Sequence, residues 1–501
     1  MRLAPRSLLD NLVVPAVCAA GAVTAFVLFR ELRHDDAFIT FRYARNLATG
    51  AGFVFNPGER VLGTTSPLLT LLLAAVYAIA GDVLERAALV IGAVALGAQA
   101  LALHRLLREH LPHTALLVCL AVLAGLGGSH TWLALESNLA LALSLSCLWA
   151  HRRGSPRLAG LLLGLAFLTR HDAALIALLL PLVDAAHPPD ARPDLRARIT
   201  ALLPVAAVAA AVTLPWLLFA QLHFGAPLPN TLSAKTGISA PGAYLESYAG
   251  YFIAVEPLGR LPAAARQPLF WCACALGALG SLRGGGRITL ALTLQALALW
   301  LVYARIGPPA SQHWHMLPAT TLLRVAALVG VVGSLELLLR RYRAGVGALV
   351  VAALAVAYLM VLTPALQKRA STVGTEFWLG ERHRRYTIVA HWVNAHTHAD
   401  ITFMPNEVGT LGYLSDRRML DPFGLLSPTN DYPKTMRLTA LFELFERHDP
   451  DLILLGSPGQ AHALKRYAPH RGYRIIKIFP WLRTWSTLVI PGPRQSQILR
   501  Q

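Results

Sequence analysis

The sequence predicts an all-α, polytopic membrane protein that ends in a soluble α/β domain, and three observations lead to this prediction. Of the 501 residues, 55% are hydrophobic and only 14% are charged, whereas soluble domains average roughly 25% charged residues. Uncharged runs, such as those within 11–30 and 344–364, are long enough to cross about 30 Å of hydrocarbon as helices. After Pro364 the chain becomes polar and its pattern changes.

The apolar runs predict about 11 transmembrane helices. The first run is interpreted as a retained helix rather than a signal peptide, because no clean small-residue cleavage site follows it. The predicted spans are 11–30, 87–104, 113–129, 132–150, 157–169, 172–183, 199–222, 268–282, 288–304, 316–338 and 344–364.

A further apolar run, 67–80, decides the topology. If it crossed the membrane, 157–183 would have to form one span, which would bury the charges at 170–172 at a cost of about 2.5–3.5 kcal/mol each. If it instead lies in the membrane plane or re-enters, the arginine-rich short loops all face the cytoplasm. We therefore predict a transmembrane domain at 1–365 with a long first external loop at 31–86. The N-terminus is then cytoplasmic, and the tail domain, 366–501, is external.

The net charge of +18 does not indicate a nucleic-acid partner. The basic residues are mostly arginines in short clusters between apolar runs, which is typical of cytoplasmic loops that face anionic lipid head groups. The five cysteines lie in apolar segments, and Cys272 and Cys274 would project to different faces of a helix. The sequence therefore predicts membrane lipids as partners, with neither a cysteine metal pair nor a disulfide framework.

The tail alternates between strand and helix patterns, which predicts a small α/β domain. Its acids Glu407, Asp416 and Asp421 are interpreted as ordinary turn and surface residues. The predicted strands are 401–404, one ending near 421, 452–455, 475–479 and 486–490, and the predicted helices are 433–446 and 459–467.

The densest run of unusual residues, 34–47, follows the first span. Asp35 and Asp36 are adjacent carboxylates on the water side of a helix end, where such a pair can hold a general base or a cation. The structural alternative is that they merely end the first helix. Residues 37–47 have helical spacing with Phe38 and Phe41 on one face, which predicts an amphipathic helix lying on the membrane.

This loop resembles that of the GT-C superfamily of integral-membrane glycosyltransferases. The match is to a bacterial branch that is similar to mycobacterial arabinofuranosyltransferases and polyprenyl-phosphate-mannose-dependent mannosyltransferases. The resemblance lies in DDAFITFR at 35–42 and FNPGER at 55–60, and it recurs in order at 135–137, 168–170, 229–235 and 406–413. At 171–172 and 137–138 the sequence departs from the residues that are common in these relatives.

The resemblance implies a glycosyltransferase of the bacterial inner membrane. Such an enzyme transfers a sugar from a polyprenyl-phosphate donor to a cell-envelope glycan, lipid or protein on the external face, with inversion at the anomeric carbon. Asp35 is the implied base and Asp36 the orienting acid, although the two roles are exchangeable. The tail is expected to cover the catalytic cavity and to help bind the glycan acceptor.

The predicted topology places further polar residues on the same external face as the acid pair. For Lys235 the alternative is a solvated loop lysine, and for Arg170 an ion pair with Asp172 or Glu136. His313 and His315 could ligate a divalent metal, but such a pair is more often part of an interfacial belt, so no metal site is assigned and no cofactor is certain. The candidates for binding the donor phosphate or the substrate are Lys235, Arg170, Glu136, Arg305, His313, His315 and Arg42.

Two other functional classes remain open. A secondary transporter could use the same acids for ion coupling, although transporters usually contain internal repeats and broken helices, and no repeat is evident here. An envelope scaffold without catalysis would explain the spans but not the acids and bases clustered on one face.

Overall fold

A computed structural model describes most of the chain, and the described residues form two compact units. Unit 1 comprises residues 1–32, 86–216 and 239–373, and unit 2 comprises 33–85, 217–238 and 374–501. The described residues are 9–31, 33–125, 133–181, 195–236, 262–282, 286–306, 313–339, 380–405, 407–426, 438–480, 485–492 and 495–500.

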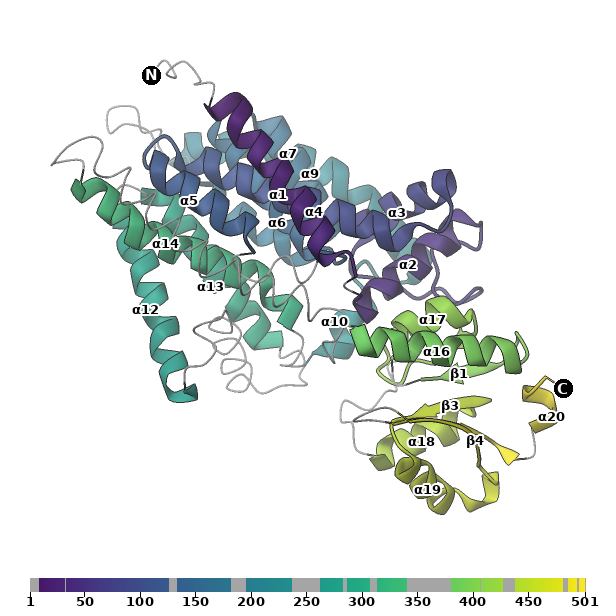
Figure 1. The fold of residues 1–501 in the computed structure, drawn as a ribbon. Helices are drawn as coiled ribbons and strands as arrows, with labels where there is room; N and C mark the ends of the chain where they lie inside the picture. The colour runs from purple at the N-terminus through teal and green to yellow at the C-terminus, as the bar shows by residue number, and fades with distance from the viewer. Residues whose placement is uncertain are drawn as a thin grey trace. The chain divides into compact units, whose positions relative to one another are not determined.

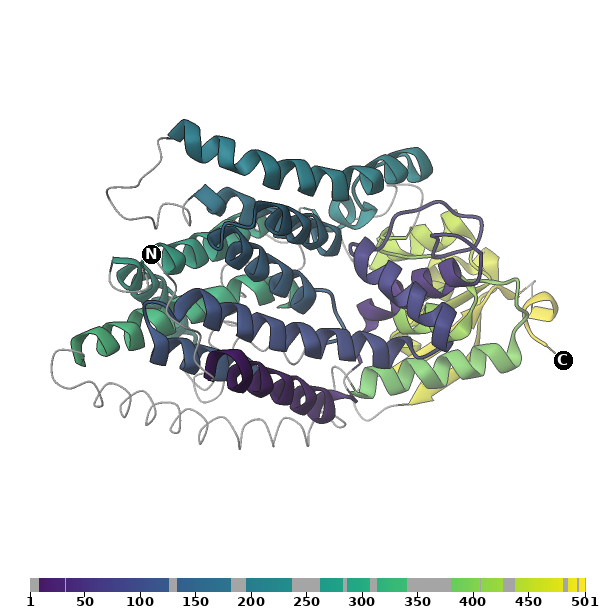
Figure 2. The same cartoon turned by 90° about the horizontal axis from the view of Figure 1, so that it is seen from above.

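Unit 1 is helical in the residues described. Figures 1 and 2 show its helices lying side by side, and α6 packs on α7 while α14 packs on both α12 and α13. The elements are η1 (Leu9–Val13), α1 (Val14–Phe29), α4 (Leu84–Leu107), α5 (Pro112–Leu123), α6 (Ser137–Arg152), α7 (Pro156–Thr169), η3 (His171–Leu179), α9 (Leu195–Phe224), α12 (Ala263–Leu282), α13 (Gly286–Ile306), η6 (His313–Met316) and α14 (Leu317–Leu339).

Small residues let these helices approach closely. A Cβ at Gly330 of α14 would overlap the backbone oxygen of Leu276 in α12, so only glycine fits at this crossing. Because lipid tails are as apolar as leucine side chains, van der Waals contact between backbones is a main source of association for such helices in a membrane.

Five helices in the described part of the chain are long and apolar enough to cross a membrane. Several of their leucine and valine side chains are exposed, which in water would be unfavourable and in lipid is expected. These are the features of a multi-pass membrane protein. The five are Asn11–Phe29, Leu84–Leu107, Thr200–Phe224, Ile288–Ile306 and Leu317–Leu337.

The predicted number of about 11 spans is not confirmed. The span predicted at 172–183 begins with η3, a 3-10 helix of nine residues that rises about 18 Å, and its last two residues lie outside the described part of the chain. Helix α7, with 14 residues, is also short for a span. The span predicted at 344–364 lies outside the described residues.

Unit 2 contains a five-stranded sheet with the order β2-β1-β3-β5-β4. β1 pairs in parallel with β2 and β3, while β5 pairs antiparallel with β3 and β4. The strands are β1 (Thr402–Met404), β2 (Arg418–Met419), β3 (Leu452–Leu455), β4 (Arg474–Pro480) and β5 (Trp485–Ile490).

Helices cover both faces of this sheet, which confirms the predicted α/β character of the tail. In Figure 1, α18 (Leu438–His448) and α19 (Pro458–Tyr467) lie on one side, where Phe442, Phe445 and Leu464 form a core with the strands. On the other side lie α16 (Gly380–His396) and α17 (Gly409–Ser415). The short η7 (Pro469–Arg471) and α20 (Gln495–Ile498) complete the tail.

The first loop and the tail belong to the same compact unit. The sequence predicted two domains that are each continuous in the chain and meet at residue 365, whereas unit 2 of the structure combines three separate stretches. The side-chain amide of Asn56 exchanges two hydrogen bonds with the backbone of Met419, at 2.8 and 3.0 Å. Asn230 donates its backbone N–H to Leu62 at 2.8 Å and its side-chain amide to Gly424 at 2.8 Å. Polar side chains therefore join the three stretches.

The predicted helix after the acid pair exists, but not as a membrane-surface helix. Helix α2 (Asp35–Ala48) has an almost continuous run of buried residues, because α3 (Pro67–Ala80) and α17 both pack against it. The amphipathic pattern therefore reflects burial in protein. Helix α3 begins and ends where the apolar run predicts, and its 14 residues rise only about 21 Å.

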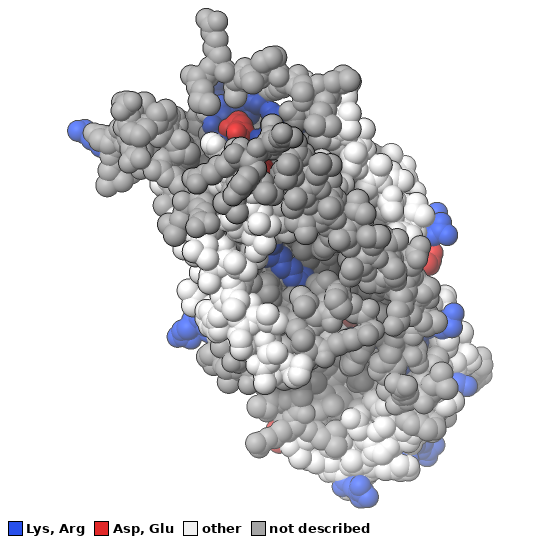
Figure 3. All heavy atoms as spheres, turned by 60° about the vertical axis from the view of Figure 1, so that its left-hand side comes forward, with Lys and Arg blue, Asp and Glu red and all other residues white. Residues whose placement is uncertain are grey.

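The face shown in Figure 3 is largely neutral among the described residues. Lys and Arg side chains are scattered over it and exceed the Asp and Glu side chains, as the net charge of +18 leads one to expect. We therefore find on this face no single acidic or basic patch of described residues that would dominate the choice of a partner.

Candidate functional site

Asp35 and Asp36 form the first turn of α2, directly after His34. Acidic side chains are favourable there, because the unpaired N–H groups and the helix dipole give a helix N-terminus a partial positive charge. The acid pair therefore begins the second helix rather than ending the first one. This placement holds both carboxylates on a rigid element.

The carboxylate of Asp35 holds the start of α17. Oδ2 accepts the backbone N–H of Gly409 at 3.0 Å, and Oδ1 accepts that of Thr410 at 2.8 Å. These are N–H groups that a helix cannot satisfy internally, so Asp35 acts as a cap supplied from a distant part of the chain. A Cβ at Gly409 would overlap the backbone oxygen of Asp35, so the close approach requires glycine.

Burial raises the pKa of Asp35, and repulsion from Asp36 adds to the rise, while the hydrogen bonds from Thr410 oppose it. When one of two adjacent carboxylates is desolvated, burial and repulsion both favour its neutral form, so it takes up a proton readily. The same pair can therefore cap a helix and take part in proton transfer.

Glu407 lies beside this pair, and its sequence interpretation as a surface acid is wrong. Its Oε1 pairs with Arg382 of α16 at 2.7 Å, and its side chain is 24% exposed. Its other oxygen, Oε2, is buried and has no hydrogen-bond partner among the described residues. Burial, with repulsion from Asp35, raises the pKa of Glu407 to about 8, although Arg382 opposes the rise.

The other two tail acids are structural. Asp421 is buried and accepts the backbone N–H groups of Phe423, Leu425 and Leu426, so it fixes a turn. Asp416 pairs with Arg45 at 2.7 Å and is exposed. The turn-and-surface interpretation therefore holds for Asp416, whereas Asp421 is a turn residue but not a surface one.

Aromatic and imidazole rings pack around the acid pair. The rings of Phe38 and His383 stack with centroids 5.2 Å apart, and Tyr413 lies 5.7 Å from Phe38. Burial lowers the pKa of His383 to about 4 and that of His34 to about 3. Both imidazoles are therefore neutral at pH 7, and the positive charge near the acids comes from arginine.

Arg42 does not have the position of a phosphate ligand. It is 2% exposed, and its two terminal nitrogens donate to the carbonyl oxygens of Gly412 at 2.6 Å and Arg417 at 2.9 Å. Its guanidinium also lies 4.4 Å from the centre of the Phe55 ring. Burial lowers the pKa of Arg42 to about 9. Arg42 therefore joins the first loop to the tail.

A second polar cluster lies in unit 1, around Arg170 at the end of α7. Arg170 is 5% exposed and donates to both oxygens of Asp172, at 3.0 and 2.9 Å, and to Glu136 at 3.1 Å. It also donates to Ser137 at 3.2 Å and to Tyr303 at 2.6 Å, and Tyr303 in turn donates to Asp172 at 2.6 Å. The ion-pair alternative for Arg170 is thus confirmed with both partners.

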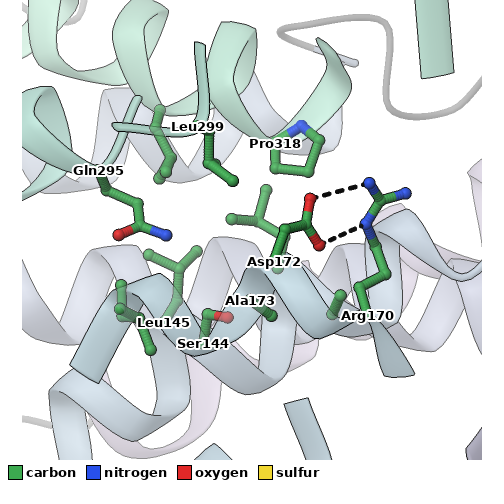
Figure 4. A pocket seen from close by; sticks show the side chains of 12 residues that line it. Ser144, Leu145, Arg170, Asp172, Ala173, Gln295, Leu299 and Pro318 are labelled. Atoms are coloured by element: carbon green, nitrogen blue, oxygen red, sulfur yellow. Dashed lines mark hydrogen bonds and ion pairs between the residues drawn. The ribbon is translucent and has the colours of Figure 1, made fainter. Parts of the chain in front are cut away.

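A cavity opens beside this cluster between α6, η3, α13 and α14 (Figure 4). It encloses about 340 Å³ of empty space, part of which is open to solvent, and its lining is mostly apolar. Gln295 and Ser144 line it together with Arg170 and Asp172. Gln295 is 3% exposed, and its Oε1 accepts no hydrogen bond from the residues that the structure describes.

The remaining predicted residues are less informative. Lys235 ends α10 (Asn230–Lys235) and His313 begins η6, but both side chains lie outside the described part of the chain. Arg305 is exposed on α13. The ring of His315 stacks on Tyr303 with centroids 5.5 Å apart. Within the described ranges, no three His, Cys, Asp or Glu side chains are grouped to hold a metal ion.

Four residues of these two clusters were not predicted as site residues from the sequence. In unit 2 the missed partners are Glu407 and Arg382, and in unit 1 they are Asp172 and Tyr303. The motif at 406–413 and the basic run at 382–385 were signals for the first two, but nothing in a single sequence shows that they approach residue 35.

The tail matches a known domain family. Residues 375–497 match the model of a domain of unknown function, DUF8728. No curated protein matches the chain.

The chain also has the fold of two solved membrane proteins. One is ArnT from Cupriavidus metallidurans bound to undecaprenyl phosphate, with a TM-score of 0.56 and 15% identity over 96% of this chain and 98% of that one. The other is the archaeal oligosaccharyltransferase AglB from Archaeoglobus fulgidus, in complex with an inhibitory peptide and a dolichol-phosphate. Its TM-score is 0.57, with 13% identity over 92% of this chain and 71% of that one. At these identities the likeness concerns the fold alone.

Proposed function

We propose that this protein transfers a sugar from a polyprenyl-phosphate donor to an acceptor of the cell envelope. The observation that carries the proposal is the likeness over 96% of the chain to a protein bound to undecaprenyl phosphate. The second structural relative holds a dolichol-phosphate. A polar site that combines buried acids with arginine is suited to react with such a lipid-linked phosphate.

The reaction needs a base and a site for the departing phosphate. The acceptor hydroxyl attacks the anomeric carbon, and its proton passes to a carboxylate of the acid pair. The bond from the anomeric carbon to the phosphate oxygen breaks, and the electron pair leaves with the prenyl phosphate. Direct displacement of this kind inverts the anomeric centre. A carboxylate positioned beside the acceptor hydroxyl can take this proton as a general base.

Within the pair, the two acids have different roles in this proposal. Asp35 binds two backbone N–H groups of α17, which leaves it fewer lone pairs for a substrate. Asp36 follows it in the first turn of α2, and we propose Asp36 as the base and Asp35 as the residue that fixes its position. The sequence resemblance implied the reverse and left the two roles exchangeable.

The finer assignments are proposals as well. We infer a protein of the bacterial inner membrane with a cytoplasmic N-terminus and a periplasmic tail, which would place the acid pair at the outer face. The sugar is inferred to be a pentose or hexose of the arabinofuranosyl or mannosyl type, from the resemblance at 35–42 and 55–60. The acceptor is a glycan, lipid or protein that the tail helps to bind.

The test starts from the lipid that co-purifies with the full-length protein. Mass spectrometry should find a prenyl phosphate that carries a sugar, and labelled sugar from that lipid should appear on a cell-envelope acceptor when the protein is reconstituted. Uptake of a labelled solute by proteoliposomes that contain only this protein, without any sugar transfer, would instead support a secondary transporter and would overturn the proposal.

A further inference from the structure

We propose that Arg382 binds the phosphate of the lipid-linked donor and that ionised Glu407 competes with the phosphate for Arg382. The inference rests on the proposed function, because it concerns the same acid-pair site. It assigns a phosphate ligand and a proton-linked control of donor binding to two residues in the tail.

Arg382 has the accessibility that a ligand-binding cation needs. Its side chain is 35% exposed, whereas its partner Glu407 is 24% exposed. Its charge interacts with Asp35 and Asp36 as well as with Glu407, so it lies within electrostatic range of the proposed base. An arginine fork also matches the geometry of phosphate oxygens.

Three other arginines of unit 2 donate to backbone oxygens of α17 and have further partners. Arg42 donates to two carbonyl oxygens. Arg45 pairs with Asp416 and donates to the carbonyl oxygen of Tyr413 at 3.0 Å. Arg417 is buried and donates to Thr397 and Ser415. Arg382 differs from these three because its partner is a half-buried carboxylate with one oxygen that no described residue satisfies, which a proton can neutralise, whereas the Asp416 partner of Arg45 is exposed.

Glu407 supplies that neutralisation. The charged groups that face it are Asp35 and Asp36 from α2, with Arg382, Arg385 and Tyr386 from α16. Its Oε2 has no hydrogen-bond partner among the described residues, so its ionised form is poorly compensated. When a phosphate anion approaches Arg382, the added negative charge disfavours ionised Glu407 further. Above about pH 8, where Glu407 is ionised, donor binding is therefore accompanied by uptake of a proton at Glu407, whereas at lower pH Glu407 is already protonated and Arg382 is available to the phosphate.

The proposal predicts how affinity for the lipid depends on pH. Protonated Glu407 is the binding-competent form, so affinity is constant below the pKa of Glu407, which is about 8, and falls above it. The affinity of the full-length protein for undecaprenyl phosphate should then be about tenfold lower at pH 9 than at pH 7. The second ionisation of a phosphate monoester lies near pH 6, so the charge of the lipid itself is nearly constant across this range.

Three variants test the two residues. Glu407→Gln should bind undecaprenyl phosphate with the same affinity at pH 7 and pH 9. Arg382→Gln should bind about tenfold or more weakly at both, and Arg382→Lys should retain part of the affinity. Asp416→Asn is the matched control, because it removes another Arg–carboxylate pair of unit 2 at a residue with φ of 52° that asparagine tolerates. It should bind as the wild type does.

Two outcomes would overturn the inference. One is wild-type affinity in folded Arg382→Gln, and the other is a Glu407→Gln variant that keeps the fall in affinity above pH 8. The binding measurement needs no turnover, so it is separate from the test of function. Lipid binding with the expected pH dependence but without sugar transfer would contradict the proposed function alone. Sugar transfer by Arg382→Gln with a wild-type KM for the donor would contradict the phosphate assignment alone.

Discussion

In the two polar clusters of the molecule, hydrogen bonds and ion pairs compensate the buried charges to different degrees. In unit 1, Arg170 is 5% exposed and both oxygens of Asp172 accept hydrogen bonds, while Glu136 and Tyr303 complete the network. In unit 2, the Arg382–Glu407 pair is partly exposed, and one oxygen of Glu407 has no hydrogen-bond partner among the described residues.

We infer different roles for the two clusters from this difference. A network in which every donor and acceptor is used is rigid, and a ligand could enter it only by breaking strong bonds. An ion pair whose carboxylate has an unsatisfied oxygen can exchange its partner for a ligand more easily. We therefore propose that Arg170 contributes to stability and Arg382 to binding, although the sequence analysis included Arg170 among the phosphate candidates.

The largest effect on stability is expected from Arg170→Met. The substitution leaves two buried carboxylates without their cation, which typically costs about 3–5 kcal/mol. The fraction of folded protein in detergent, measured by size exclusion and thermal unfolding, should fall sharply, whereas Tyr303→Phe should lose about 1–2 kcal/mol. A stable Arg170→Met protein that fails to bind undecaprenyl phosphate would reverse the comparison and restore Arg170 as a phosphate ligand.

A loss of similar size is expected from Arg42→Met. Two carbonyl oxygens lose a charged donor, and each such bond is worth about 1.5–3 kcal/mol. Unit 2 should unfold at a lower temperature, and sugar transfer should fall only in proportion to the folded fraction. The control is Arg45→Met, which removes one carbonyl bond, to Tyr413, and an ion pair with exposed Asp416, so it should cost about half as much. A loss of donor affinity in folded Arg42→Met protein would contradict the structural role.

Gly409→Ala should lower both stability and activity, and activity by more than the loss of folded protein explains. The new Cβ overlaps the backbone oxygen of Asp35, so α17 has to move away from α2 at a cost of about 1–3 kcal/mol. Sugar transfer should fall by more than the folded fraction, because the acid pair loses its position. Gly459→Ala is the matched control, since the nearest atom to its Cβ would be Ser457 Oγ at 3.7 Å. Equal effects of the two substitutions would argue against the close approach of Asp35 to α17.

A further effect is the dependence of stability on pH at Glu407. Its pKa is raised from 4.5 to about 8 on folding, so the folded protein binds more protons than the unfolded chain within this window. Stability therefore falls as pH rises from about 5 to 8. Glu407→Gln should remove this part of the decline, and thermal unfolding of both proteins at pH 5 and pH 8 provides the measurement. A decline of the same size in the variant would show that Glu407 titrates normally.

The sequence predicts local structure well where a single pattern suffices. The run 67–80 becomes α3 with the same bounds, and the strand predicted at 452–455 is β3. The amphipathic pattern of 37–47 was ambiguous, because contact with lipid and contact with protein select the same spacing of apolar residues. Only the packing of α3 and α17 on α2 distinguishes the two cases.

The site was predictable only in part. Adjacent carboxylates at 35 and 36 are visible in the sequence, but the N–H group that Asp35 binds lies 374 residues away at Gly409. Glu407 looks like an ordinary loop acid until this contact brings it to the pair. For Arg170, the sequence contained both the correct ion-pair alternative and the phosphate interpretation. Burial and the number of hydrogen bonds decide between them, and neither quantity can be obtained from residue types alone.

The most direct test of the account is the rate at which variants of the acid pair transfer sugar from the lipid-linked donor. In nanodiscs, Asp36→Asn should lower the rate by about 10²–10⁴, a far larger change than the loss of one acidic side chain in the first turn of α2 causes in stability. Asp35→Asn should lower both the rate and the stability, because Asp35 also caps α17. Transfer at the wild-type rate by both variants would contradict the account, since the acid pair would then have no part in the reaction.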